Sequence, residues 1–185
     1  MSRTSLAATL LLVAPVLAQQ PPAAVSPEVR PDHTVVFRIH APKASSVSVG
    51  GEFGRRSLAK DEGGVWSVTV GPLEPDLYTY LFTVDGVPTV DPRNAKLKLG
   101  RSSVNNLVDV PGDKPGPHDL RAVPHGTLHV HRYESKSLNG KSRGLVVYTP
   151  PGYDPASETR YPVLYLLHGS GDDEHGWTNV GRADR

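Results

Sequence analysis

The 185-residue sequence contains no cysteine. Disulfide bonds, a thiolate nucleophile and a cysteine-ligated zinc site are therefore excluded. It also lacks an excess of either charge, because the formal net charge is only +1. Lys and Arg are interspersed with Asp and Glu rather than clustered, so the composition does not indicate nucleic acid as a partner. We expect one domain or two small ones from this length.

No apolar run reaches the roughly 20 residues that a membrane-spanning helix needs. The longest run extends from Leu6 to Leu17, and small residues stand at Val16 and Ala18, the two positions that a signal peptidase recognises. This pattern predicts a secretory signal peptide cleaved after Ala18. No cysteine follows the run, which excludes a bacterial lipoprotein. We expect the mature protein to be secreted or periplasmic, with no membrane attachment after cleavage.

Glycine and proline are abundant, with 18 residues of each, which favours turns and short strands over long helices. In "VWSVTV", Trp66, Val68 and Val70 lie on one face of a predicted half-buried strand. The run "LYTYLFTV" is apolar on both faces and predicts a central strand covered on both sides, and Asp85-Gly86 after it is typical of a tight turn. Six or seven such strands predict an antiparallel sandwich of immunoglobulin-like architecture.

The segment "GVWSVTVGPLEPDLYTYLFTVDGVPTVDPRN" resembles the early-set, immunoglobulin-like modules of the carbohydrate-binding family 48 type. The resemblance rests on the tryptophan, the P-x-x-Y-x-Y-x-F spacing from Pro75, and the Asp91-Pro92 pair. It implies contact with a glycan, in which the exposed face of Trp66 or Tyr78 would stack on a sugar ring. The alternative is core packing, because both aromatics are in phase with apolar residues of their strands.

Ser142 lies in "GKSRG", which matches the G-x-S-x-G pattern of a nucleophilic serine. A nucleophile elbow needs a buried strand directly before the serine and a helix directly after it. Upstream of Ser142 the chain is polar, with Asn139-Gly140 typical of a hairpin turn, and downstream a predicted strand ends in prolines. Ser142 is therefore assigned to a hairpin end and not to catalysis.

The later stretch "YTPPGYDPASETRYPVLYLLHGSGDDEHGW" resembles the start of an α/β-hydrolase domain of the esterase D-like and feruloyl-esterase group. Val163 to Leu167 predicts a strand buried on both faces that ends at His168, and such sheets bind ligands at the carboxyl ends of their strands. In the family, backbone N–H groups after this strand form part of the oxyanion hole. By position these would be Gly169 and Ser170.

The histidines offer weaker hypotheses. The resemblance implies a structural role for His168 rather than that of a catalytic base. His129 and His131 point to the same side of a predicted strand, a spacing that suits metal ligation, but an exposed strand face is the simpler interpretation. The run from His168 to His175 is interpreted as an acidic loop that enters a helix, with Asp172 or Asp173 as N-cap. We expect neither a metal nor another cofactor.

Enzymes of this group use Ser, Asp or Glu, and His in that chain order, and the family places all three downstream of the oxyanion loop. No catalytic residue is thus assigned, and we expect the chain to be an inactive front portion of a longer enzyme. The predicted domains, in order, are a signal peptide (1–18), a disordered leader (19–31), an immunoglobulin-like module (32–112), a linker (113–127) and an incomplete α/β-hydrolase domain (128–185).

Three functions follow from these resemblances. The first is a secreted Ser-His-Asp esterase acting on feruloyl or acetyl esters of plant polysaccharide. The second is a carbohydrate-binding module that contacts glucan or xylan without catalysis. The third is a signalling or transport protein that uses the sandwich to contact another protein. The family resemblance alone supports the polysaccharide context, because fold does not fix function.

Overall fold

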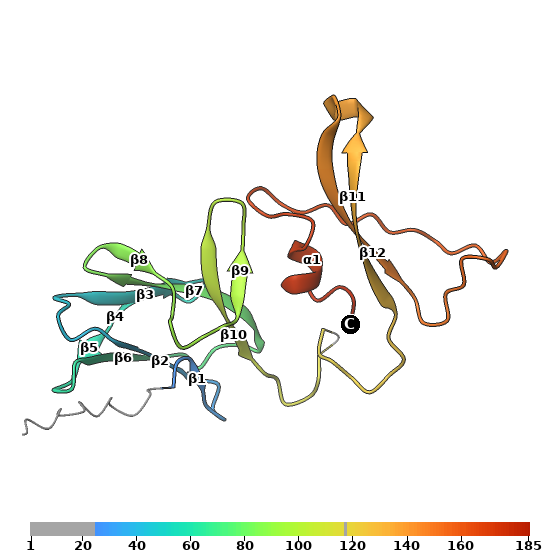
Figure 1. Cartoon of the computed structure of the whole chain (residues 1–185). Coiled ribbons are helices and arrows are strands. Elements are labelled where there is room, and N and C mark those ends of the chain that lie inside the picture. The colour runs from blue at the N-terminus through green and yellow to red at the C-terminus, as the bar shows by residue number, and fades with distance from the viewer. Residues whose placement is uncertain (1–24, 117) are drawn as a thin grey trace, which may run out of the picture.

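The computed structural model describes residues 25–116 and 118–185 (Figure 1), so the predicted signal peptide lies outside the described residues. The fold is mainly β and every strand pair is antiparallel, which confirms the predicted fold class. Within the described part of the chain, no helix is both long enough and apolar enough to cross a membrane.

Two antiparallel sheets form the first unit. The first sheet has the strand order β1-β2-β6-β5, with β1 Glu28–Val29, β2 Val35–His40, β5 Ala59–Lys60 and β6 Val65–Val70. The second has the order β4-β3-β7-β10-β9, with β3 Val47–Gly51, β4 Gly54–Ser57, β7 Asp76–Val84, β9 Leu97–Leu99 and β10 Val104–Val110. Strand β8, Val87–Thr89, pairs with β7. The blue and green strands at the left of Figure 1 are these two layers.

The apolar faces of both sheets meet in one core. Alternate residues of each strand point inward, which is the arrangement that period-two patterning dictates. Phe37 of β2 is fully buried and its ring lies 4.7 Å from that of Tyr80 of β7. The first sheet contributes Val35, Phe37, Ile39, Trp66 and Val70, and the second contributes Val47, Val49, Tyr80, Phe82, Val108 and Val110.

Strand β7 is central, as predicted, with β3 on one side and β10 on the other. The prediction that both of its faces are covered was wrong. Tyr80 and Phe82 are buried, whereas Leu81 between them is only half-buried, because a two-layer sandwich covers one face of each sheet. The predicted turn after β7 is confirmed, since Asp85 and Gly86 both have positive φ and connect β7 to β8.

A buried polar cluster closes one side of this core. Asp91 is 2% exposed, and its carboxylate accepts hydrogen bonds from the hydroxyls of Ser26 at 2.6 Å and Tyr80 at 2.8 Å. The backbone N–H of Asp91 donates to the Asn106 side chain, and Asn94 donates to the Tyr80 hydroxyl. Burial is the main cause that raises the pKa of Tyr80. The cluster therefore connects the N-terminal segment to β7, β10 and the Asp91-Pro92 turn.

The first unit begins before the predicted boundary at Asp32. Residues 28–29 form the edge strand β1, which pairs with β2, and the Ser26 side chain is buried against Asp91. The description of residues 19–31 as a disordered leader was therefore wrong for the part that the structure describes. Hydrogen bonding to β2 and to the buried carboxylate orders this segment.

A long hairpin follows the connecting segment, which comprises residues 111–126 between β10 and the hairpin. Strands β11, Thr127–Ser135, and β12, Lys141–Thr149, pair in register from Thr127↔Thr149 to Ser135↔Lys141. A single 3₁₀ turn, η1 Lys136–Leu138, leads into Asn139 and Gly140, which both have positive φ. This confirms the predicted hairpin turn. The hairpin rises away from the sandwich in Figure 1.

The predicted strand over Val163–Leu167 is not formed. No residue from 160 to 169 is assigned to a strand, and Leu164 and Leu167 are 79% and 86% exposed. A strand buried on both faces acquires its hydrogen bonds and its cover from neighbours, and no described strand pairs with this segment. The one α-helix of the described residues, α1 Gly176–Asn179, follows the acidic loop as expected.

Candidate functional site

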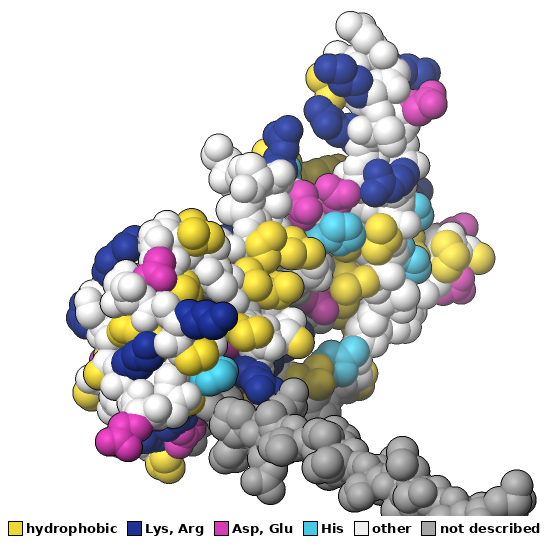
Figure 2. All heavy atoms as spheres, turned by 60° about the vertical axis from the view of Figure 1, so that its left-hand side comes forward, with side chains coloured by type: hydrophobic (Ala, Val, Ile, Leu, Met, Phe, Trp, Pro, Cys, Tyr) yellow, Lys and Arg dark blue, Asp and Glu magenta, His cyan; other side chains and the backbone are white. Residues whose placement is uncertain are grey.

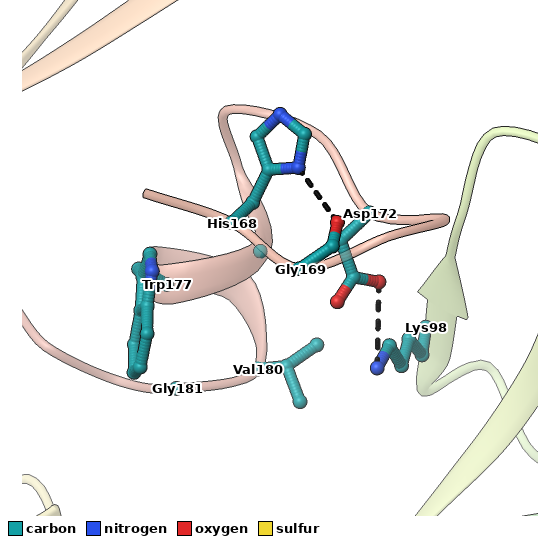
Figure 3. Close-up of a pocket in the computed structure, with 8 residues that line it drawn as sticks. Lys98, His168, Gly169, Asp172, Trp177, Val180 and Gly181 are labelled. Carbon is teal, nitrogen blue, oxygen red and sulfur yellow. Dashed lines mark hydrogen bonds and ion pairs between the residues drawn. The ribbon is translucent and has the colours of Figure 1, made fainter. Parts of the chain in front are cut away.

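A small pocket lies where the first unit meets the C-terminal segment. It is lined by Lys98 of β9, by His168, Gly169 and Asp172 of the loop before α1, and by Gly176, Trp177, Val180 and Gly181. Figure 3 shows Lys98 opposite the loop, with Trp177 and Val180 on the helix side. Its volume is about 200 Å³, less than most sites that enclose a whole ligand. Of the two residues predicted for the oxyanion hole, Gly169 lines the pocket and Ser170 does not.

Local hydrogen bonds shape the loop from His168 to Asp172. The Asp172 N–H donates to the Gly169 carbonyl at 3.3 Å, and the His168 ring Nδ1 lies 2.9 Å from the same oxygen. Gly171 has a φ of +92°, a conformation that favours glycine because it has no Cβ. The sequence "HGSGD" therefore folds into a tight turn at this point.

The backbone N–H groups of Gly169 and Ser170 donate no hydrogen bond to any residue that the structure describes. A Cβ built at Gly169 would meet no atom within 4 Å, so the space beside this residue is open. Unengaged N–H donors beside an open space are what an incoming oxyanion requires. The assignment of these two residues to an oxyanion hole remains a prediction.

The predicted N-cap of α1 was wrong. His175, not Asp172 or Asp173, occupies that position, and no side chain caps the helix. Asp173 instead accepts a hydrogen bond from the His175 N–H at 2.9 Å. Asp172 faces the first unit, where it pairs with Lys98. The acidic residues thus stabilise the loop and its contacts rather than the helix terminus.

Ser142 lies in β12, where it pairs with Glu134 of β11 and is exposed. This confirms its assignment to a hairpin end. Among the described residues, no group of three or more His, Cys, Asp or Glu side chains could hold a metal ion. His129 and His131 stack with ring centroids 6.3 Å apart, and His129 Nε2 lies 3.0 Å from the Thr149 hydroxyl.

The two aromatic residues considered for sugar stacking differ in exposure. Trp66 is 8% exposed, and its indole N–H donates to the Ala41 carbonyl at 2.9 Å. A ring that belongs to the core cannot stack on a sugar in this conformation. Tyr78 is half-buried against the core, and its hydroxyl donates to the Glu74 carbonyl. Burial, followed by the charge of Asp76, raises the pKa of Tyr78.

Sequence reasoning did not identify Lys98 or Arg182. Lys98 Nζ lies 3.4 Å from Asp172 Oδ1. Arg182 pairs with Asp109 of β10, and its second nitrogen lies 3.6 Å from Asp119. The sequence gives no signal for either residue, because a charged residue that pairs with a partner 73 positions away cannot be distinguished by its local sequence from a solvated one.

Comparison with known proteins identifies the class of the first unit. Residues 23–98 match the model of carbohydrate-binding module 48, described as the isoamylase N-terminal domain. The two-layer antiparallel fold of these residues agrees with this assignment. The segment 23–98, which makes up most of the N-terminal unit, is thus similar to carbohydrate-binding module 48.

Most of the chain is similar to an endo-1,4-beta-xylanase/feruloyl esterase from Xylanibacter ruminicola. The two are 35% identical over 155 residues, which cover 80% of this chain and 21% of that protein. The alignment is longer than the segment that matches the module, so the similarity continues beyond the sandwich. The chain spans about a fifth of the length of this relative.

Two solved structures are more distantly similar. The ferric enterobactin esterase of Salmonella typhimurium is 18% identical, with 72% of this chain and 45% of that chain covered, at a TM-score of 0.48. The pneumococcal glycogen-degrading virulence factor SpuA is 20% identical, with 59% and 14% covered, at a TM-score of 0.41. Similarities at this level carry no argument about function.

Proposed function

We propose that this chain is the N-terminal part of a secreted carboxylic-ester hydrolase that acts on esterified plant polysaccharide. The observation that carries the proposal is the 35% identity to the endo-1,4-beta-xylanase/feruloyl esterase, which continues past the carbohydrate-binding module. The sandwich would bind the polysaccharide, and the segment from residue 128 onward would begin the hydrolase domain.

The exposed segment from Val163 to Leu167 supports this proposal. Val163, Leu164, Tyr165 and Leu167 are 70%, 79%, 83% and 86% exposed. A continuous run of large apolar side chains in water is unfavourable, at roughly 25 cal/mol for each Å² of apolar surface, and large exposed apolar patches mark sites that another surface covers. Further strands and helices of a hydrolase domain would cover this run and complete it as a strand.

The proposed chemistry is acyl transfer through a serine nucleophile. Attack on an ester carbonyl places negative charge on its oxygen, and a preorganised N–H donor lowers that barrier by roughly 3 kcal/mol. Gly169, which Figure 3 labels, and the adjacent Ser170 would supply such donors. The nucleophile, base and acid would come from residues outside these 185, so the 185-residue chain by itself is expected to be inactive.

The same family assignment supports a second function, in which the sandwich binds glucan or xylan without any catalysis. Tyr78 is the aromatic residue that would contribute to such a surface, because part of its ring is exposed whereas Trp66 is buried. Affinity electrophoresis of the chain in gels containing xylan or glucan measures this binding. Retardation by either polymer supports the module function, and equal mobility in gels with and without polymer contradicts it.

The esterase proposal is tested by sequencing the gene beyond the codon for Arg185 and assaying the extended product on feruloyl and acetyl esters. The proposal requires a downstream serine elbow and measurable hydrolysis. In that product, Ser170→Pro removes the N–H donor, and we expect kcat to fall by about 10²–10³-fold. The matched control Ser170→Ala removes the hydroxyl but keeps the N–H, and should retain activity. A stop codon after Arg185 would contradict the esterase proposal. Equal activity of Ser170→Pro and Ser170→Ala would contradict the assignment of the Ser170 N–H to the oxyanion hole.

A further inference from the structure

The turn between β9 and β10 contacts the loop before α1 through backbone and side chain. The Arg101 N–H donates to the Gly171 carbonyl at 2.8 Å, and Lys98 Nζ lies 3.4 Å from Asp172 Oδ1. A Cβ added at Gly100 would lie 2.8 Å from the same Gly171 oxygen, which is closer than real Cβ contacts. The backbones therefore approach each other too closely for a larger side chain at residue 100.

Arg182 forms a second attachment, on the other side of α1. Its side chain is only 10% exposed and pairs with Asp109 of β10 and with Asp119 in the connecting segment. Its φ is +50°, a left-handed conformation that is unfavourable for a residue with a Cβ. Such a conformation persists where surrounding contacts determine it, and the two carboxylates provide those contacts.

These contacts hold the segment from His168 to Arg182 at both of its ends. One end meets β9 and the β9–β10 turn, and the other end meets β10. Lys98 also lines the pocket together with His168 and Gly169, as Figure 3 shows. The sandwich thus supplies one wall of the pocket rather than serving only as an attached binding module.

We propose that Lys98 and Arg182 are positioning residues through which the sandwich fixes the loop that carries Gly169 and Ser170. The description of this loop as an oxyanion loop rests on the function proposed above, whereas the attachment itself does not. The two ion pairs differ in burial. Lys98 and Asp172 are 30% and 29% exposed, so their pair is partly screened, and Arg182 makes the stronger attachment.

Hydrogen exchange of the 185-residue chain, followed by mass spectrometry, tests the attachment without requiring activity. The N–H groups of Val180 and Gly181 donate to the Gly176 carbonyl, so their exchange reports on the ordered segment. We expect Arg182→Gln to accelerate exchange in peptides covering residues 168–182 by about tenfold or more, as loss of a largely buried ion-pair partner implies. Lys98→Ala should accelerate it by about twofold to fivefold, as for a partly exposed pair.

Matched controls separate this effect from a general loss of charge or of folding. Lys96→Ala alters an exposed lysine beside β9, and Arg185→Gln alters an exposed arginine near Arg182. Neither should change exchange in residues 168–182. Exchange in peptides from β7 must remain slow in every variant, which shows that the sandwich is intact. Equal exchange in Arg182→Gln, Lys98→Ala and the two controls would overturn the proposal.

Two further variants test the mechanism of the attachment. The exchanged pair Lys98→Asp/Asp172→Lys should restore the exchange rates that Lys98→Asp alone raises, since it restores the attraction. Gly100→Val introduces a side chain at the close approach without altering charge, and it should also accelerate exchange in residues 168–182. Failure of the pair to restore protection would refute a specific ionic contact. If attachment is confirmed and the extended product lacks esterase activity, only the proposed function fails.

Discussion

The cluster around Asp91 gives the strongest prediction about stability. Asp91→Ala removes a carboxylate that accepts hydrogen bonds from Ser26, Tyr80 and the Arg93 N–H. Because Ser26 and Tyr80 are 4% and 1% exposed, water cannot replace the lost partner without entering the core. Each buried donor left unsatisfied costs about 1–3 kcal/mol.

These losses are not simply additive, because both hydroxyls keep a hydrogen bond in which they act as acceptors. Tyr80 still receives a hydrogen bond from Asn94, and the Ser26 hydroxyl still accepts one from the Arg38 N–H. We expect a loss of about 2–6 kcal/mol in the free energy of unfolding, because two buried hydroxyl donors lose their acceptor at about 1–3 kcal/mol each. That is a large fraction of the 5–15 kcal/mol of an ordinary domain.

Urea unfolding followed by tryptophan fluorescence measures this loss. Trp66 lies in the sandwich core and Trp177 lies outside it, so a Trp177→Phe background makes the emission report on the sandwich alone. Asp113→Ala is the matched control, because Asp113 is an exposed aspartate beyond β10. A change below about 1 kcal/mol for Asp91→Ala, the size of a single ordinary hydrogen bond, would refute the reasoning.

Two other predictions concern the same sandwich. Trp66→Ala should reduce the free energy of unfolding by about 3–5 kcal/mol in urea titrations followed by circular dichroism, because the ring is buried and donates to Ala41; a loss near zero would contradict its core position. The hydrogen bond from Arg38, and then the charges of Arg38 and Arg30, lower the pKa of Glu28 below 4.5. Its contribution is therefore present above pH 4.5 and disappears as pH falls through the lowered pKa. Glu28→Gln should be slightly less stable than the wild type at pH 7 and equally stable in acid, and a difference that grows in acid would show that the sign is wrong.

The local sequence was sufficient to predict the structure wherever neighbouring residues determine the backbone conformation. Trp66 and Val70 alternate with polar residues in β6, and burial of this face follows from the geometry of any strand. The turns at Asp85-Gly86 and Asn139-Gly140 could be predicted because Asp-Gly and Asn-Gly are among the few residue pairs that tolerate positive φ at both positions. Ser142 could be excluded as a nucleophile for a similar reason, since its flanking residues predict a hairpin.

The sequence by itself determined the β-rich sandwich and its turns, because alternation and turn chemistry act over a few residues. Only the tertiary structure decided which polar and charged side chains meet. Asp91 contacts Ser26 across 65 positions, and Arg182 contacts Asp109 across 73. It also decided that Val163–Leu167 is exposed, since a strand needs neighbours to supply its hydrogen bonds. Pairings between distant residues depend on how the chain folds back, and no local pattern encodes them.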